Sequence, residues 1–404
     1  MYSIGVISEW NPFHNGHRYL LQEIHHKHPE AVVIGIMSGN YVQRGQPAVL
    51  TKWQRARTAL LNGCDLVVEL PVWYATAPAD LFGDGGVGMA TALGCDGLAF
   101  GVENTNFRDY ETLADWVVAH PDWEEEISKP ATLNRGQATL EALGQLPYSV
   151  PALSHLTIDF TAASNMLLAF SYAKANAKRH HPLQLLPIQR SGAHHRTEQV
   201  DTASPYTSST AIRQALTRPI TPDAEESLKS FIPEATWQDL IASDVFPTLS
   251  QWYPYLRYQL LSQSQETLRN YYQMYEGIEV VFQRAAKTNR TLDDFMLQVT
   301  NRQWTPGRVR RALVMMGLGV RESEMLDVLN GLQPLFLLGA SIQGRRYLKS
   351  GQLPVDSKYH LISRVDRTVS KKWPLWLRAD RIYQCFLNPT VEEQNFGHPP
   401  VFVQ

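Results

Sequence analysis

The chain has 404 residues, of which 44% are hydrophobic and 19% charged, and its formal net charge is −2. This length suggests more than one domain, and the composition is typical of a soluble globular protein. No apolar run is long enough to span a membrane, and the N-terminus has no signal-peptide pattern. The three cysteines, Cys64, Cys95 and Cys385, are far apart and suggest neither a disulfide framework nor a metal site. We therefore expect a cytoplasmic protein.

The first hundred residues alternate short apolar runs with helical patterns. Apolar runs span residues 2–8, 31–37, 65–70 and 97–100, and helical patterns follow the first three at 17–28, 52–62 and 78–93. Such alternation predicts a parallel sheet covered by helices on both faces. Ligands of such sheets bind beyond the carboxyl ends of the strands.

The pattern changes later in the chain. A helical pattern over 159–178, an apolar run over 184–188 and a helix through Leu216 complete the first part. Pro219 and Pro222 then interrupt a polar stretch, and the remaining chain is mostly helical in pattern. We predict an α/β, Rossmann-like domain over residues 1–220, followed by a mostly α-helical domain over 221–404.

The segment His14-Asn15-Gly16-His17 lies where the first strand gives way to the first helix. Pro12 ends the strand because it has no N–H for the ladder, and a helix N-terminus attracts anions. We expect Gly16 to let a phosphate approach the backbone. His14 and His17 then donate hydrogen bonds to phosphate oxygens and stabilise the transition state. The alternatives are a helix cap with surface histidines and a zinc site, for which no third ligand is evident.

A second polar segment, Thr207-Ser208-Ser209-Thr210-Ala211-Ile212-Arg213, opens a later helix. Hydroxyls at a helix start with an arginine one turn later form an anion site, although a plain N-cap has the same pattern. Because the same chain also contains the histidine turn, we favour the anion site over the plain N-cap. Ser38–Gly45, with Lys52, Arg55 and Arg57 after it, suits either ligand approach or a solvated basic face.

These two segments resemble the HxGH and SSTxIR signatures of the nucleotidyltransferase superfamily. Residues 9–17, 37–45, 63–71 and 100–103 resemble bacterial tRNA(Met) cytidine acetate ligases more specifically. The resemblance implies that a nucleotidyltransferase domain joins acetate to ATP, forming acetyl-adenylate and pyrophosphate. The acetyl group then passes to N4 of the wobble cytidine (C34) of elongator tRNA(Met), giving N4-acetylcytidine and AMP. It implies ATP, acetate and this tRNA as partners, with Mg²⁺ expected beside ATP, and neither DNA nor a membrane.

The resemblance also implies which residues act, with His14 and His17 as the catalytic pair. The ATP site would comprise Ile7, Ser8, Glu9, Trp10, Asn11, Pro12, Phe13, His14, Asn15, Gly16, His17, Arg18, Tyr19, Leu20, Gly101, Asn165, Arg190, Ser209, Thr210 and Arg213. The assignments of Asn165 and Arg190 rest on the resemblance alone. The chain departs from the family pattern at Trp10, usually Tyr, at Val102, usually Ser, and at Met166, usually Asp. A further departure is the stretch 300–305, where the family is richer in Lys, Thr, Arg and Tyr.

Basic residues cluster late in the chain. Arginines neutralise phosphates and an aromatic ring stacks on an unpaired base, although such a cluster is also typical of a solvated helix face. We predict that one group contacts tRNA, namely Arg302, Trp304, Arg308, Arg310 and Arg311. Two other functions remain open. A small-molecule adenylyl- or cytidylyltransferase is disfavoured by the large second domain, and a non-catalytic RNA-binding protein by the complete motif set.

Overall fold

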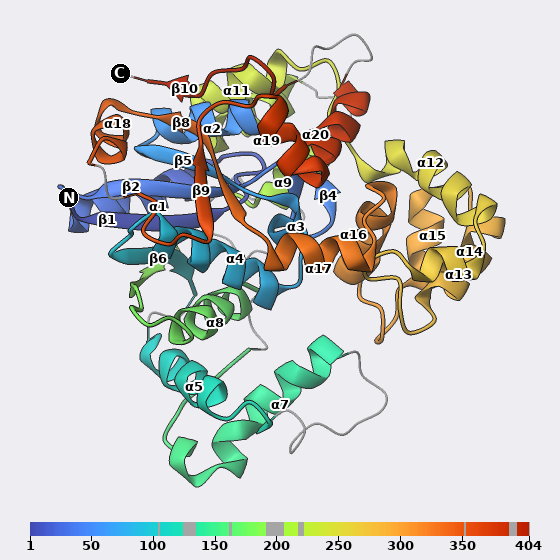
Figure 1. Cartoon of the computed structure of the whole chain (residues 1–404), viewed down its shortest axis with the longest axis horizontal. Helices are drawn as coiled ribbons and strands as arrows, with labels where there is room; N and C mark the ends of the chain where they lie inside the picture. Colours follow the sequence, from blue (N-terminus) through green and yellow to red (C-terminus); the bar gives the residue numbers. More distant parts are fainter. Residues whose placement is uncertain are drawn as a thin grey trace.

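The computed structural model describes residues 1–103, 106–123, 135–160, 164–190, 206–216, 222–350, 353–387 and 394–403. One eight-stranded sheet forms its centre, in the order β10-β8-β5-β2-β1-β6-β7, with β9 beside β8 (Figure 1). Its strands are β1 (Ser3–Ser8), β2 (Val32–Ser38), β5 (Leu66–Leu70), β6 (Gly97–Val102), β7 (Gln184–Gln189), β8 (Gln333–Ala340), β9 (Tyr359–Ile362) and β10 (Val401–Phe402). A small hairpin pairs β3 (Tyr41–Val42) with β4 (Gln46–Pro47).

The five strands of the first half are parallel to one another, as predicted. The chain builds outward from β1 through β2 to β5 and then returns to the other side of β1 with β6 and β7. The order therefore reverses between β1 and β6, and a crevice forms at such a reversal beyond the strand ends. The apolar runs are continuous because β2 and β5 are buried on both faces.

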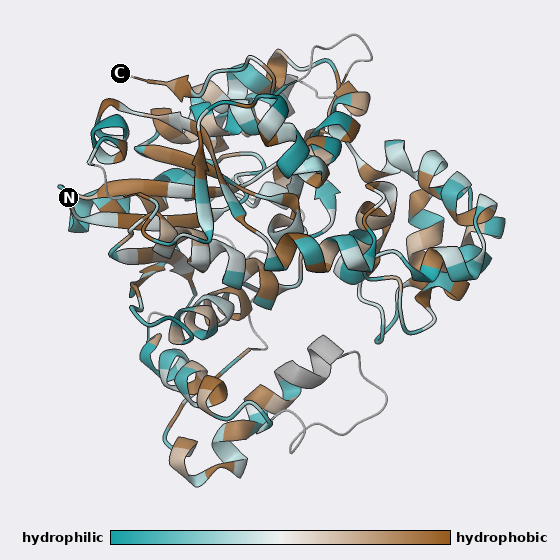
Figure 2. Cartoon of the chain, in the orientation of Figure 1, coloured by the Kyte–Doolittle hydropathy of each residue, from teal (hydrophilic) through white to brown (hydrophobic). Residues whose placement is uncertain are grey.

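Helices cover both faces of this part of the sheet. On one face, α1 (Asn15–Lys27) and α2 (Lys52–Leu61) bury their apolar side chains. On the other face lie α4 (Ala79–Ala92) and α8 (Ser164–Ala177), with α5 (Arg108–Ala119) packed against α8. The brown strands between mixed-colour helices in Figure 2 reflect this layering.

The second half contributes many helices, as predicted. They are α10 (Pro222–Phe231), α11 (Glu234–Ile241), α12 (Leu249–Ser262), α13 (Gln265–Arg269), α14 (Ile278–Thr288), α15 (Leu292–Val299), α16 (Pro306–Gly317), α17 (Glu322–Asn330), α18 (Ile342–Leu348), α19 (Arg367–Lys372) and α20 (Pro374–Leu387). Helix α9 (Ser209–Leu216) lies before them, in the first part of the chain. Helices α3 (Val72–Ala75) and α7 (Arg135–Ser149) belong to the first half. Helices α12–α15 form a lobe beside the sheet (Figure 1). None of the described helices combines the length and apolar character needed to cross a membrane.

Three strands of the second half join the central sheet, which the sequence did not predict. β8 pairs antiparallel with β5, and β9 and β10 pair parallel with β8. The predicted α/β class with a following set of helices is confirmed, but the sheet is mostly rather than wholly parallel. The predicted domain boundary at residues 220 and 221 lies outside the described residues and stays a prediction.

A buried polar cluster connects the two halves of the chain. Nζ of Lys52 lies 2.7 Å from Oε2 of Glu69 and 2.5 Å from Oδ2 of Asp380 on α20. The side-chain amide of Asn40 donates to Oδ1 of Asp380 at 2.8 Å. Lys52 and Arg55 are both fully buried, so neither lies on a solvated basic face. Only Arg57, which pairs with an acidic residue of α11, is partly exposed.

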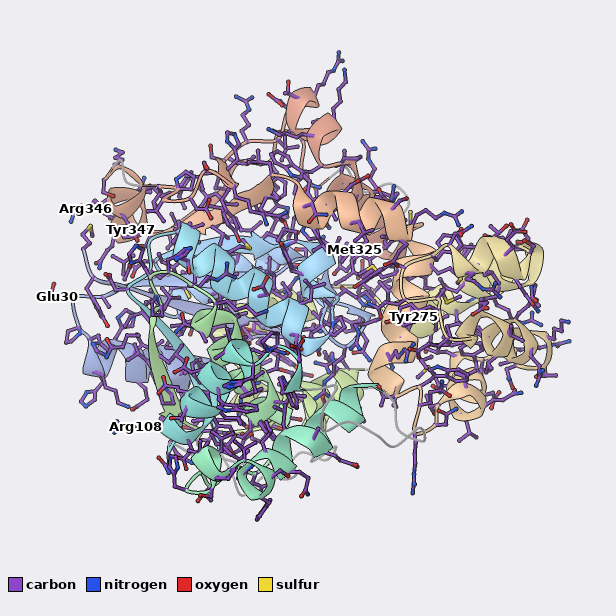
Figure 3. All side chains as sticks on the ribbon, turned by 60° about the horizontal axis from the view of Figure 1, so that its bottom comes forward. Glu30, Arg108, Tyr275, Met325, Arg346 and Tyr347 are labelled. Atoms are coloured by element: carbon purple, nitrogen blue, oxygen red, sulfur yellow. The ribbon has the colours of Figure 1, made fainter. Side chains whose placement is uncertain are left out.

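Helix α18 adds a second connection between the halves. The hydroxyl of Tyr347 donates to the carbonyl oxygen of Leu93 at 2.8 Å and lies 3.1 Å from Oγ of Ser3. Tyr347 is labelled beside Arg346 of the same helix in Figure 3. The first strand is therefore held by residues more than 300 positions later in the chain.

Candidate active site

The histidine turn caps α1. Nδ1 of His14 accepts a hydrogen bond from the N–H of Gly16 at 3.1 Å, and the N–H of His14 donates to Nδ1 of His17 at 3.2 Å. A Cβ on residue 16 would lie 2.9 Å from Cε1 of His14, so this position requires glycine. The capping function weighed from the sequence is therefore present, and it occupies one nitrogen of each ring.

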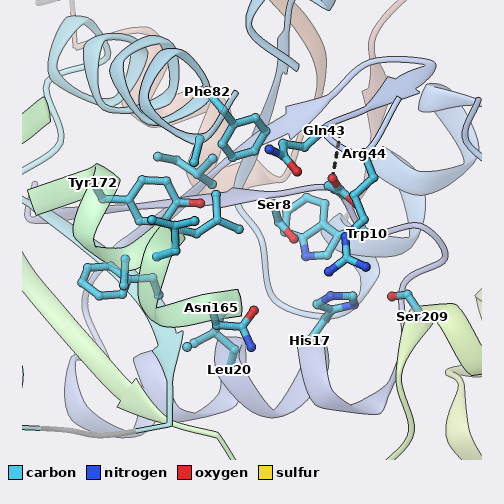
Figure 4. Close-up of a pocket in the computed structure, with 18 of the residues that line it drawn as sticks. Ser8, Trp10, His17, Leu20, Gln43, Arg44, Phe82, Asn165, Tyr172 and Ser209 are labelled. Atoms are coloured by element: carbon cyan, nitrogen blue, oxygen red, sulfur yellow. Dashed lines mark hydrogen bonds between the residues drawn. The ribbon is translucent and has the colours of Figure 1, made fainter. Parts of the chain in front are cut away.

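The two histidine rings are stacked, with centroids 3.8 Å apart and an interplanar angle of 25°. Because Nδ1 accepts a hydrogen bond in both rings, each neutral ring carries its proton on Nε2. His14 is only 5% exposed, whereas His17 lines the pocket shown in Figure 4. Of the two predicted catalytic residues, His17 is thus the one placed to touch a bound ligand directly.

The start of α9 approaches the same turn. Oγ of Ser208 accepts from the N–H of Ala211 at 3.1 Å and so provides the helix cap. Arg213, one turn into α9, donates from Nη1 to the carbonyl oxygen of Asn11 at 2.7 Å and from Nη2 to Oγ1 of Thr210 at 3.1 Å. With Ser208 as the cap, Ser209 and Thr210 are left to line the pocket. The structure therefore brings the two predicted anion-binding segments together.

The pocket has a volume of about 270 Å³ and lies at the ends of β1 and β6, where the strand order reverses. Its lining includes twelve of the residues predicted to bind ATP, namely Ile7, Ser8, Glu9, Trp10, His17, Leu20, Gly101, Asn165, Arg190, Ser209, Thr210 and Arg213. The other predicted residues do not line it; they are Asn11, Pro12, Phe13, His14, Asn15, Gly16, Arg18 and Tyr19. Contacts of ATP with any of these residues stay predictions.

Sequence reasoning missed part of the pocket wall. The further lining residues are Gln43, Arg44, Ala79, Phe82, Phe100, Leu167, Leu168, Ala169 and Tyr172. Gln43 and Arg44 belong to the loop after β2, for which ligand approach was one of two open interpretations. The others are apolar or aromatic residues of strands and helices, and in the sequence such residues are indistinguishable from core positions.

Three arginines from distant segments interact electrostatically at this pocket. Arg44 and Arg213 line it, and Arg310 on α16 lies close enough to interact with both. Burial lowers the pKa of Arg213; Glu9 raises it, whereas Arg44 and Arg310 lower it further. Like charges held together in this way are stabilised by an anion, and a polyphosphate satisfies this requirement.

The buried side chain of Arg55 holds together the loops that follow β1 and β2, and both loops contribute residues to the pocket wall. Its guanidinium donates to the carbonyl oxygens of Glu9 at 2.7 Å and Ser38 at 2.9 Å, and also to that of Gly39. Burial lowers its pKa to about 10. Glu9 in turn accepts a hydrogen bond on Oε1 from the N–H of Gln43 at 2.9 Å. The ends of β1 and β2 are therefore held together by one cation that does not itself line the pocket.

Asn165 and Arg190 also line the pocket, although nothing in the sequence apart from the family resemblance pointed to them. The side-chain amide of Asn165 donates to Oε1 of Glu103, just after β6. A Cβ on Gly101 would lie 3.2 Å from Cγ of Arg190, so these two residues are neighbours. Neutral and cationic donors thus meet at the end of β6, which suits a polar ligand such as a nucleotide.

The predicted tRNA-contacting group is only partly accessible. Arg302 is exposed, whereas Arg308 pairs with Glu276 at 3.0 Å and lies over the ring of Tyr275, labelled in Figure 3. Burial lowers the pKa of Arg311 to about 10. Trp304 is 7% exposed and packs in the hydrophobic core, so its ring is not available to stack on a base. The prediction for Trp304 is wrong because its indole supports the lobe instead.

A family model, described as HIGH Nucleotidyl Transferase, matches residues 1–398. Curated tRNA(Met) cytidine acetate ligases align with nearly the whole chain. The enzyme from Lactobacillus delbrueckii subsp. bulgaricus is 34% identical, with 99% of each chain covered. That from Latilactobacillus sakei is 36% identical, with coverages of 98% and 97%. The chain belongs to the tRNA(Met) cytidine acetate ligase family.

Two solved structures share the fold. Thermotoga maritima TmcAL in an apo form aligns with a TM-score of 0.87 at 24% identity, with 100% of both chains covered. The same enzyme bound with alpha-thio ATP aligns with a TM-score of 0.85 at 23% identity, again over 100% of both chains. The arrangement of one mixed sheet with a helical lobe is therefore shared with a solved structure.

The departures from the family pattern fall mostly in the core. Val102 and Met166 are 0% and 3% exposed, and neither is among the described residues that line the pocket. Trp10 is 1% exposed and packs against Phe13, with ring centroids 5.7 Å apart. The resemblance implies Ser at position 102 and Asp at position 166, and the apolar residues present there, Val102 and Met166, lie in the core.

Proposed function

We propose that this chain is an ATP-dependent acetate ligase that modifies the wobble cytidine of elongator tRNA(Met). The observation that carries the proposal is the meeting of His17 with Ser209, Thr210 and Arg213 at one pocket, at the sheet's reversal point. The name of the curated relatives supplies the substrates. The proposal covers both the activation of acetate and its transfer to the tRNA.

In the first step an acetate oxygen attacks the α-phosphorus of ATP. The bond from this phosphorus to the bridging oxygen of pyrophosphate breaks, and the negative charge leaves with pyrophosphate. Nε2–H of His17 and the guanidinium of Arg213 are the donors that we assign to the phosphate oxygens as charge develops. Ser209 and Thr210 add hydroxyl and helix N-terminal donors. Positioning and charge stabilisation then suffice, without a covalent enzyme intermediate.

In the second step the exocyclic N4 of the wobble cytidine attacks the acetyl carbonyl. AMP leaves, and the nitrogen loses one proton. The cytidine must be splayed out to reach the pocket, which requires tRNA on the surface beside it. Arg310 interacts electrostatically with Arg44 and Arg213, and the exposed Arg302 lies shortly before α16 in the sequence. This continuity supports tRNA contact along α16.

The residues described here do not provide a metal site of their own. Among them, no group of three or more His, Cys, Asp and Glu side chains is arranged to hold an ion. Glu9 is the single carboxylate on the described pocket wall, and Gln43 already donates to it. Mg²⁺ would therefore be bound by ATP phosphate oxygens, and it stays a prediction. A cytoplasmic location likewise stays a prediction.

Incubating the purified protein with ATP, labelled acetate and bulk tRNA tests the proposal. We expect pyrophosphate and AMP, with label in N4-acetylcytidine of elongator tRNA(Met). Absence of acetate-dependent adenylate would contradict the whole proposal. Adenylate formed without transfer to tRNA would contradict the second step alone and favour a small-molecule nucleotidyltransferase.

A further inference from the structure

The ring of Tyr172 on α8 lines the pocket and the residue is only 5% exposed, and no hydrogen bond joins its hydroxyl to another described residue. Its ring packs edge-on against Phe100, with centroids 5.7 Å apart. Buried tyrosine hydroxyls usually find a partner. A hydroxyl on a pocket wall without a protein partner is therefore available to a bound molecule.

The surroundings of this hydroxyl are apolar. Ile7, Phe82 and Phe100 are each less than a tenth exposed and line the same pocket. We call Ile7, Phe82, Phe100 and Tyr172 the tyrosine end. Figure 4 shows the hydroxyl of Tyr172 pointing into the pocket near Phe82, with His17 across from it. The pocket therefore has an apolar end with one hydroxyl and a polar end with the phosphate-binding donors.

The tyrosine end consists of uncharged side chains. Burial raises the pKa of Tyr172, and Glu9 raises it further, so the hydroxyl keeps its proton and acts as a donor. None of its four residues carries a positive charge, and the lining arginines are Arg44, Arg190 and Arg213. A small anion bound here lies near the carboxylate of Glu9 and is oriented by a neutral hydrogen bond from Tyr172 rather than by an ion pair. Its free oxygen consequently remains a good nucleophile.

We propose that the tyrosine end is the carboxylate subsite of this ligase, with Tyr172 orienting acetate and Phe82 limiting its length. This inference rests on the proposed function. The methyl group packs on Phe82 and Ile7, and one carboxylate oxygen accepts a hydrogen bond from Tyr172. The other oxygen faces the α-phosphorus, attacks it and displaces pyrophosphate, while Tyr172 keeps its proton. We assign the exclusion of longer carboxylates to Phe82, which is 2% exposed and lines this end.

Acetate-dependent exchange of pyrophosphate into ATP tests the subsite without tRNA. Tyr172→Phe preserves the ring, so we expect the KM for acetate to rise about tenfold, the equivalent of one neutral hydrogen bond, with the KM for ATP within about twofold. Tyr148→Phe, at an 86% exposed position, is the matched control and should change neither. An unchanged acetate KM, or equal rises in both KM values, would overturn the proposal.

Phe82→Leu tests the length limit and stays informative if Tyr172→Phe folds poorly. We expect the preference for acetate over propionate and butyrate, as the ratio of kcat/KM values, to fall about tenfold or more. An unchanged ratio would overturn the assigned role of Phe82. Unmodified protein run in parallel separates the two levels of inference. Absence of exchange with acetate in that sample contradicts the proposed function, whereas normal exchange confines any failure to the subsite.

Discussion

Arg213 and Asn11 are 202 positions apart, yet a hydrogen bond of 2.7 Å joins Nη1 of the one to the main-chain carbonyl oxygen of the other. Asn11 belongs to the turn that leads into α1, and Arg213 to the first turns of α9. The bond therefore fixes the distance between the two segments that we assign to the triphosphate. An arginine is needed because it can hold this carbonyl and Thr210 with separate nitrogens.

Replacing Arg213 by lysine keeps the charge and removes this two-nitrogen geometry. We expect Arg213→Lys to lower kcat for acetate-dependent ATP–pyrophosphate exchange by about 10²-fold, within the range seen for loss of one transition-state donor. Arg108→Lys, at an exposed position of α5, is the control. If the activity of Arg213→Lys were close to that of the control, Arg213 would contribute only its positive charge and not its two-nitrogen hydrogen bonding.

His17 is predicted to act on the phosphate as well as to cap α1. His17→Ala should abolish acetate-dependent AMP formation, whereas the lost cap costs only about 1 kcal/mol of stability. Binding of tRNA, measured by filter retention, should be unchanged. An equal loss of tRNA binding and AMP formation would mean that the role of His17 is structural.

Gly45 connects the pocket loop to α16. Its φ is +72°, and a Cβ there would lie 2.4 Å from the main-chain nitrogen of Arg311. We expect Gly45→Ala to lower the free energy of unfolding by about 2 kcal/mol or more, measured by urea denaturation. Gly277→Ala is a matched control because its φ is +80° with nothing near the added carbon. Equal losses in both variants would assign the effect to backbone strain alone.

The cluster around Lys52 predicts a pH dependence of stability. Burial raises the pKa of Glu69 from 4.5 to about 7, although Lys52 opposes this shift. Because the folded state holds this proton more tightly than the unfolded chain, the contribution of Glu69 is full below pH 4.5 and is lost as pH rises to about 7. The free energy of unfolding of Glu69→Gln should therefore fall less between pH 5 and pH 7.5 than that of the unmodified protein. Parallel curves in urea denaturation would contradict this sign.

Binding of tRNA through Arg302 predicts a salt effect. Arg302→Ala should weaken tRNA binding and reduce the slope of log K against log salt by about one. The acetate-dependent exchange reaction, which needs no tRNA, should be unaffected. If Arg108→Ala changed the slope to the same extent, the salt effect would reflect the loss of any positive charge and not a contact made by Arg302.

The strands of the first half were predictable because a strand buried on both faces leaves a continuous apolar run. β1, β2, β5 and β6 each lie within two residues of their predicted limits. β8 was not predicted, since an isolated apolar run of its length also suits a buried helix, and its partner β5 lies far away in sequence.

The polar half of the site was predictable and the apolar half was not. Hydroxyls, histidines and an arginine at helix starts also serve as caps, but two such segments in one chain favour an anion site. Tyr172 and Phe82 look like ordinary core residues, and only the fold reveals that they face a pocket. The burial of Lys52 was hidden for another reason, because its partner Asp380 is 328 positions away.

The antiparallel pairing of β5 with β8 has a consequence for how this protein is made. Until residues 333–340 leave the ribosome, the buried strand β5 has an open edge with unpaired backbone groups. An open edge of this kind invites pairing with another chain during synthesis. The first half of the protein therefore depends on residues 333–340, which are translated long after it, and a fragment that stops near residue 220 is expected to aggregate rather than bind ATP.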